Sequence, residues 1–234
     1  MNGRLCHGTR GLKDSCMDRV FNRLSSLDWG SIESTERHSR TALAELCRPG
    51  ALRELLAGVL TDKRLLRLSE RHQWGDRLVL WDDPVNQWRV RLHRFEDQAD
   101  DPHSHQWPFH TLILHGSYRH MLFGPETAVR SALENGGGLP RPSLVRTEST
   151  GSSYAIDDQM VHAIKTTADT FSVVVQGPRL KEQALRVKNG SLVPKQDGSV
   201  STLAWLRSVR TDADRVGEIA ELAHRLGLID SGRV

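Results

Sequence analysis

Five histidines fall in one short stretch of the sequence, between Asp100 and His120, and their spacing suits metal binding. Histidine is the commonest metal ligand among side chains and also titrates near neutral pH. His103 and His105 are two residues apart, so in an extended segment both side chains point to one side and can bind one ion. His110 follows a Trp-Pro loop and could turn inward at the start of the next strand. With His162 as a remote partner, the set predicts a facial group that leaves coordination positions open.

The other reading of these histidines is structural. An HxH pair is common, and a single residue such as His162 is more often a hydrogen-bonded part of the framework. His115 and His120 lie on alternating strands and are expected to face solvent. The metal site is favoured because the pair and the remote histidine occur together in a region with an all-β pattern.

A β-rich region must position these residues. A strand is predicted from Arg77 through RLVLWDD, followed by the turn DPVN and an alternating strand QWRVRLHRF. Arg91 and His93 share one face of the second strand, but alternation cannot decide whether that face lies inside. Short strands continue to about Gly177 with no helix of ten residues between them, which predicts a sandwich or barrel. No P-loop, GxGxxG or GxSxG motif is present.

Helical patterns flank the strands. Apolar residues recur every three or four positions in the first third of the chain and again near the carboxyl end. We therefore expect a flexible tail and helical layer over 1–75, a barrel over 76–200, and a pair of helices packed on the barrel over 201–234.

Composition restricts the function classes. The 234 residues carry a formal charge of +3 with dispersed basic residues, which argues against a nucleic-acid partner. No apolar run reaches membrane-spanning length, and the amino end lacks the apolar core of a signal peptide. Three cysteines, Cys6, Cys16 and Cys47, form no CxxC pair. Together these features predict a cytoplasmic location.

The histidine motifs resemble those of the cupin superfamily over roughly residues 77 to 180. The first cupin motif matches His103, Ser104 and His105, then His110 where glutamate often stands, then TLIL and Gly116; the second motif centres on His162. The resemblance implies a mainly β fold built on a double-stranded β-helix barrel. Cupins frequently dimerise, so it also implies that a homodimer is an option.

Within cupins, the chain is most similar to the thiol dioxygenase group that includes cysteine dioxygenase. That similarity implies iron on His103, His105 and His162, with His110 as a further histidine that acts as a ligand or catalytic residue. It implies that Arg77 binds the substrate carboxylate, as the family's arginine on an early strand does. Gln176 stands where the family has a tyrosine on a late strand, which implies a place near the metal.

Three further residues are predicted at the site from the strand patterns. Arg91 and His93 could line the substrate pocket, and Tyr118 could supply a proton or hydrogen bond during catalysis. We predict a mononuclear non-haem Fe(II) oxygenase that acts with dioxygen on a small carboxylate-bearing metabolite, with a thiol or an amino acid as options. The alternatives are a non-redox isomerase or lyase with Zn, Ni or Mn, and a non-catalytic cupin that binds a ligand and regulates a partner.

Overall fold

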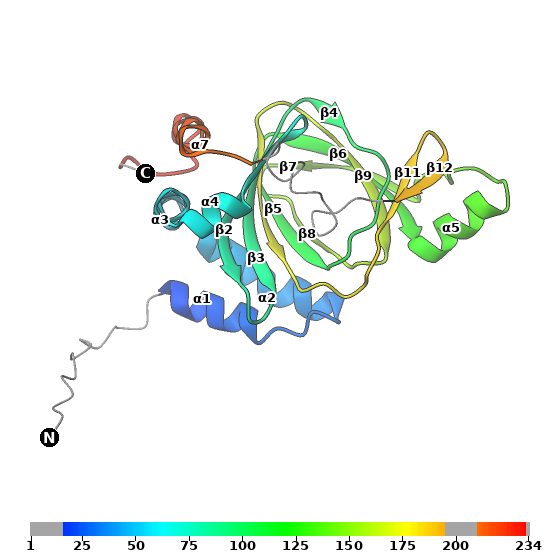
Figure 1. Ribbon diagram of the computed structural model, residues 1–234, viewed down its shortest axis with the longest axis horizontal. Helices are drawn as coiled ribbons and strands as arrows, with labels where there is room; N and C mark the ends of the chain where they lie inside the picture. Colours follow the sequence, from blue (N-terminus) through cyan, green and yellow to red (C-terminus); the bar gives the residue numbers. More distant parts are fainter. Residues whose placement is uncertain (1–15, 195–209, 233–234) are drawn as a thin grey trace, which may run out of the picture.

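The computed structural model of the chain describes residues 16–194 and 210–232 (Figure 1). Helices α1 to α4 precede the long strands, α5 lies among the strands, and α7 follows them. Their bounds are α1 (Cys16–Ser25), α2 (Ile32–Leu46), α3 (Pro49–Thr61), α4 (Lys63–Leu68), α5 (Glu126–Glu134) and α7 (Ala213–Arg225). The helical first third predicted from apolar spacing is confirmed. Helix α5, which follows β6 directly, is absent from the predicted elements.

Twelve strands make up the β-structure of the described residues. Their bounds are β1 (Glu70–His72), β2 (Gly75–Asp83), β3 (Trp88–Phe95), β4 (Gln98–Ala99), β5 (Phe109–His115), β6 (Ser117–Pro125), β7 (Leu144–Ser149), β8 (Ser153–Ile156), β9 (Met160–Thr166), β10 (Thr170–Gln176), β11 (Leu185–Lys188) and β12 (Ser191–Pro194). The predicted β2–β3 hairpin is confirmed, and its turn is held by Asp83, which accepts hydrogen bonds from the N–H groups of Val85 and Asn86 at 2.9 Å.

Two antiparallel sheets form the barrel. The six-stranded sheet has the order β1-β2-β3-β10-β5-β8, and the four-stranded sheet has the order β4-β9-β6-β7. Late strands therefore insert between early ones in both sheets: β10 lies between β3 and β5, and β9 between β4 and β6. This is the strand order of a double-sheet jelly roll, the architecture of cupins. The fold is mainly β and a cupin-type barrel, as predicted. Figure 1 shows the barrel from its open end.

The main core lies outside the barrel, between the six-stranded sheet and the helices. Strands β2, β3 and β10 contribute Leu78, Trp88, Leu92, Val173 and Val175, which are almost fully buried against apolar residues of α2, α3 and α7. In Figure 1 these helices lie on one side of the barrel. The apolar stripe of the alternating strand β3 thus faces the helices, and its polar stripe faces the barrel interior.

Two smaller clusters complete the packing. One fills part of the barrel interior and consists of Phe109, Ile113, Tyr118, Tyr154, Ile156 and Val174. The other joins α5 to the outside of the four-stranded sheet and to the β11–β12 hairpin through Val129, Val161, Leu185 and Val187.

Some predictions fall outside the described residues. These are the amino-terminal tail with Cys6 and the first part of the predicted carboxyl-terminal helix pair, of which α7 is the described member. In the parts of the chain that the structure describes, no helix combines the length and the apolar character needed to cross a membrane.

Candidate metal centre

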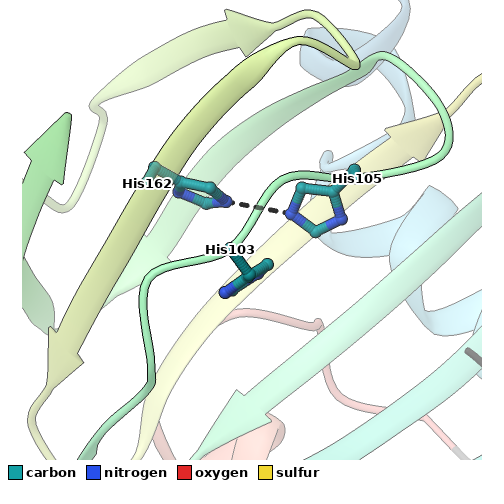
Figure 2. A group of neighbouring side chains, drawn as sticks. All are labelled: His103, His105 and His162. Carbon is teal, nitrogen blue, oxygen red and sulfur yellow. Dashed lines mark hydrogen bonds between the residues drawn. The ribbon is translucent and has the colours of Figure 1, made fainter. Parts of the chain in front are cut away.

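Strand pairing explains why a histidine far along the chain meets the HxH pair. His103 lies in the segment between β4 and β5, and it forms an antiparallel bridge with His162 of β9. The N–H of each residue donates to the carbonyl of the other, at 2.8 and 2.9 Å. Residues paired in this way have their side chains on the same side of the sheet. His105, two residues after His103, then joins the same side (Figure 2).

The three imidazoles form a group that could hold a metal ion, and their ligand nitrogens all lie within 4.8 Å of one another. Ring centroids are 4.8 Å apart for His103 and His105, 4.9 Å for His103 and His162, and 5.1 Å for His105 and His162. The Nε2 atoms of His105 and His162 are separated by 2.9 Å. Two nitrogens bound side by side to one ion at about 2.1 Å are about 3 Å apart, so this pair fits a shared cation.

Hydrogen bonding fixes which nitrogen of His103 faces the site. Its Nδ1 lies 2.8 Å from the backbone carbonyl of Asp101. A carbonyl only accepts, so Nδ1 carries the proton and Nε2 presents a lone pair, as a metal ligand must. A carboxylate oxygen of Asp100 lies 3.7 Å from the same Nδ1 and favours that arrangement further.

A buried polar cluster anchors the segment that carries the HxH pair. Ser104 is fully buried and points away from the two histidines that flank it. Its hydroxyl donates to Glu126 of α5 at 2.7 Å and accepts from the N–H of Leu185 at 2.8 Å. Lys181 completes the cluster with an ion pair to Glu126 at 2.6 Å. Helix α5 therefore helps to place the metal group.

His120 corrects one expectation, because it does not face solvent. It lies on β6 with no exposed surface, and its Nε2 is 3.0 Å from Nδ1 of His162. Its Nδ1 is 3.2 Å from Glu148 of β7. Burial lowers the pKa of His120, against the opposing effect of Glu148. The sequence held a signal for this: Tyr118, predicted at the site, is two residues away and must share its face.

His110 lies on the other side of the six-stranded sheet from the three histidines. It faces α2, where Glu36 and Arg40 act on its charge, and its Nε2 is 2.7 Å from the hydroxyl of Ser153. Burial lowers its pKa to about 4. The neighbouring Phe109 points inward instead, with its ring 4.9 Å from that of His105. The prediction that His110 turns inward as a ligand or catalytic residue is thus wrong, because side chains alternate along β5 and Phe109 takes the inward position.

Four other predicted residues line the inner face of the six-stranded sheet: Arg77, Arg91, His93 and Gln176. Cross-strand pairing aligns Arg77 of β2 with His93 of β3, and Arg91 of β3 with Val174 of β10. Val174 belongs to the interior cluster, so this face is the inner one. Gln176 is one pair further along the same face. The structure therefore settles the side to which Arg91 and His93 point, which alternation left open.

Charge is unevenly balanced on this inner wall. Arg77 forms an ion pair with Glu70 at 2.8 Å, and Arg89 forms one with Asp82. Burial alone would raise the pKa of Glu70, but Arg77, the hydrogen bond to His72, and Arg91 lower it to about 2. Arg91 is only 8% exposed and has no carboxylate within ion-pair distance among the described residues. Burial, and then the charges of Arg77 and Arg89, lower its pKa.

Several buried polar atoms of this wall lack a hydrogen-bond partner within the described parts of the chain. They are Nε of Arg77, Nε of Arg91, Nε2 of His93 and Oε1 of Gln176. Burial and the two nearby guanidinium groups lower the pKa of His93, so its imidazole is neutral. Buried polar atoms are nearly always paired in native proteins, so four such atoms on one wall indicate a place for a polar ligand.

Trp107 connects this wall to the metal group. The Arg91 guanidinium lies 5.9 Å from the ring of Trp107, and that ring is 6.2 Å from the ring of His105. Tyr118 is a buried residue of β6 in the four-stranded sheet, and its hydroxyl is hydrogen-bonded to that of Tyr154. Burial, and then Tyr154, raise the pKa of Tyr118. Its phenol therefore stays protonated and is a hydrogen-bond donor or acceptor in the interior.

No protein-family model and no curated protein matches the chain. Solved structures that resemble it include KdgF from Halomonas sp. (14% identity, 46% of this chain and 83% of that one, TM-score 0.35). A second is the polyketide cyclase RemF from Streptomyces resistomycificus (16% identity, 50% of this chain and 75% of that one, TM-score 0.35). A third is a cupin-2 domain protein from Shewanella frigidimarina (11% identity, 45% of this chain and 83% of that one, TM-score 0.33). At such scores these likenesses add nothing to the fold assignment, which stands on the strand order.

Proposed function

We propose that the protein is a metal-dependent enzyme, a mononuclear non-haem iron oxygenase that acts on a small carboxylate-bearing metabolite. The observation that carries the proposal is the convergence of His103, His105 and His162 on one point inside a barrel. Three imidazoles suit Fe(II), and also Zn or Ni, better than they suit Mg or Ca. When bound there, iron would supply dioxygen chemistry and Lewis acidity toward an anionic substrate group.

The ligand set favours an anionic substrate. Three neutral imidazoles leave the full charge of a divalent ion uncompensated, unlike a set that includes a carboxylate. His103 is held in the tautomer that presents Nε2, so its position and basicity are set before an ion binds. An anionic group such as a thiolate or enolate would therefore be attracted to this end of the barrel interior.

The opposite wall supports a carboxylate on the same substrate. Arg91 forms no ion pair with a carboxylate of the described residues, and the charges of Arg77 and Arg89 act on it more strongly than those of Glu70 and Asp82, whereas Arg77 forms an ion pair with Glu70. The planar guanidinium binds carboxylates through two parallel hydrogen bonds. One uncompensated positive charge fits a monoanion better than a dianion. We therefore assign Arg91 as the main anchor, with Arg77, His93 and Gln176 as flanking polar groups.

The experiment that tests the function combines elemental analysis with oxygen uptake. The full-length protein is purified without added ions, its metals are measured, and uptake is followed with small monocarboxylates that carry a thiol, an amine or an enol. Iron together with carboxylate-dependent uptake supports the oxygenase. Zinc, nickel or manganese without uptake contradicts the redox step and favours a Lewis-acid isomerase or lyase. Absence of metal, even after incubation with Fe(II), contradicts the metal centre itself.

A further inference from the structure

A second layer of buried side chains extends the metal group across the four-stranded sheet. His120 of β6 lies between Glu148 of β7 and His162 of β9, which are the neighbouring strands on either side. The Nδ1 of His120 is 3.2 Å from Glu148, and its Nε2 is 3.0 Å from Nδ1 of His162. Glu148 is 5% exposed and His120 is not exposed at all. The three side chains form one continuous hydrogen-bonded chain.

The chemistry of the groups gives this chain a direction. An ionised carboxylate only accepts hydrogen bonds, so the proton of neutral His120 must be on Nδ1, toward Glu148. The Nε2 of His120 is then an acceptor, and Nδ1 of His162 must carry the proton that it accepts. The remaining nitrogen of His162, Nε2, is left with its lone pair. That lone pair faces Nε2 of His105, 2.9 Å away, where the ion would lie.

Glu148 is itself held in place by an ion pair. Arg146, also on β7, forms an ion pair with the same carboxylate oxygen that contacts His120. The guanidinium of Arg146 also lies 5.2 Å above the ring of Tyr154, which packs 4.7 Å from the ring of His120. The carboxylate is therefore oriented by Arg146, a group outside the metal site.

We propose that His120 and Glu148 are positioning residues of the metal centre, which hold His162 in the Nδ1-protonated tautomer and strengthen Nε2 as a donor. This inference rests on the proposed metal centre. Carboxylate–histidine pairs behind a ligand raise its basicity and fix its ring orientation. The backing differs between the ligands: His103 donates to the carbonyl of Asp101, with a carboxylate oxygen of Asp100 3.7 Å from the same Nδ1, whereas His162 is linked to Glu148 through a second histidine.

Cobalt(II) binding to the full-length protein tests this role without an activity assay. Affinity is measured by competition with a chelator at fixed pH, and the visible absorption spectrum of the bound cobalt reports the ligand field. We expect His120→Leu to weaken cobalt binding about 10- to 100-fold and to change the spectrum. His120→Gln should recover part of the affinity, because an amide oxygen can accept from Nδ1 of His162. Glu148→Gln, which keeps an acceptor but removes the charge, should fall between the wild type and His120→Leu.

The matched control is His110→Leu, which removes another fully buried histidine of the same barrel, on the far side of the six-stranded sheet. It should cost stability but leave cobalt affinity and the spectrum unchanged. Wild-type affinity and an unchanged spectrum in folded His120→Leu overturn the positioning role. If His120→Leu does not fold, Glu148→Gln decides the matter by the same two measurements. A wild-type protein that binds no cobalt refutes the metal centre, whereas binding that depends on His162 but not on His120 refutes only this inference.

Discussion

The two walls of the barrel interior balance charge in opposite ways. On the side of the four-stranded sheet, His103 and His162 have their Nδ1 atoms in defined hydrogen bonds, and a buried carboxylate, Glu148, lies at the end of the chain. On the six-stranded sheet, Arg91 is buried without a matching carboxylate in the described structure. The first wall offers lone pairs to a cation, and the second offers a positive charge to an anion.

The comparison indicates which wall is built for stability and which for a ligand. Ordered hydrogen bonds satisfy the Nδ1 atoms of His103 and His162, so these two side chains cost little when no ligand is bound. An uncompensated guanidinium in a buried site destabilises the fold, because its desolvation is not repaid by a partner. A substrate with a carboxylate at one end and a metal-binding group at the other would complete both walls at once.

The largest expected effect is on metal content, which should differ between variants of the two walls. His105→Ala removes a ligand nitrogen, so we expect the purified variant to lose its bound metal, as measured by elemental analysis. Arg91→Met should retain the wild-type metal content, since its side chain lies on the opposite wall and binds no cation. Equal metal loss in both variants would contradict the division into a cation wall and an anion wall.

The next effect concerns the anion. Arg91→Met should weaken the binding of the carboxylate substrate or a carboxylate inhibitor at least about 30-fold, because a buried charge-assisted contact is lost. Titration calorimetry with the metal-loaded protein measures this. Arg91→Lys is the control: it keeps the charge but loses the planar fork, so its affinity should be intermediate. If Arg77→Met has the larger effect, the anchor is Arg77, as the family resemblance implied.

A smaller effect should appear in stability, with opposite signs for two residues of the same wall. Glu70→Gln leaves Arg77 without its 2.8 Å partner, so the free energy of unfolding should fall by about 1–3 kcal/mol. Arg91→Met removes the unmatched charge, so unfolding should become more costly by about 1 kcal/mol. Urea denaturation of the metal-free proteins measures both. A loss of stability in Arg91→Met would mean that Arg91 already has a stabilising partner.

The last effect lies on the outer face of the six-stranded sheet and depends on pH. Burial lowers the pKa of His110 from 6.5 to about 4. As pH falls below 6.5, the unfolded chain takes up this proton before the folded one does, so stability decreases between about pH 6.5 and 4 and then levels off. The slope for this group is at most about 1.4 kcal/mol per pH unit. The His110→Gln variant should show a shallower slope over that range in urea denaturation.

Local sequence patterns were enough to predict much of the architecture. The three-and-four spacing of apolar residues was enough for the first helices, and strict alternation was enough for β3 and its hairpin with β2. The nine-residue α5 was missed because it follows directly after β6 and ends at a run of glycines, so its pattern is too short to stand out. Because α5 was not predicted, the role of its residue Glu126, which anchors the segment that carries His103 and His105, was missed as well.

Sequence alone determined that His103 and His105 share a side, since the strand period of two is a local property of the backbone. It could not determine which side of a strand faces the barrel interior, because the period only shows which residues share a side. For β3, the tertiary structure decided this, because its apolar residues pack against the helices on the outer face of the six-stranded sheet. Arg91 and His93 therefore face the interior. The meeting of His162 with His103, and of His120 with both His162 and Glu148, was likewise decided by strand pairing between distant segments, which only the folded barrel contains.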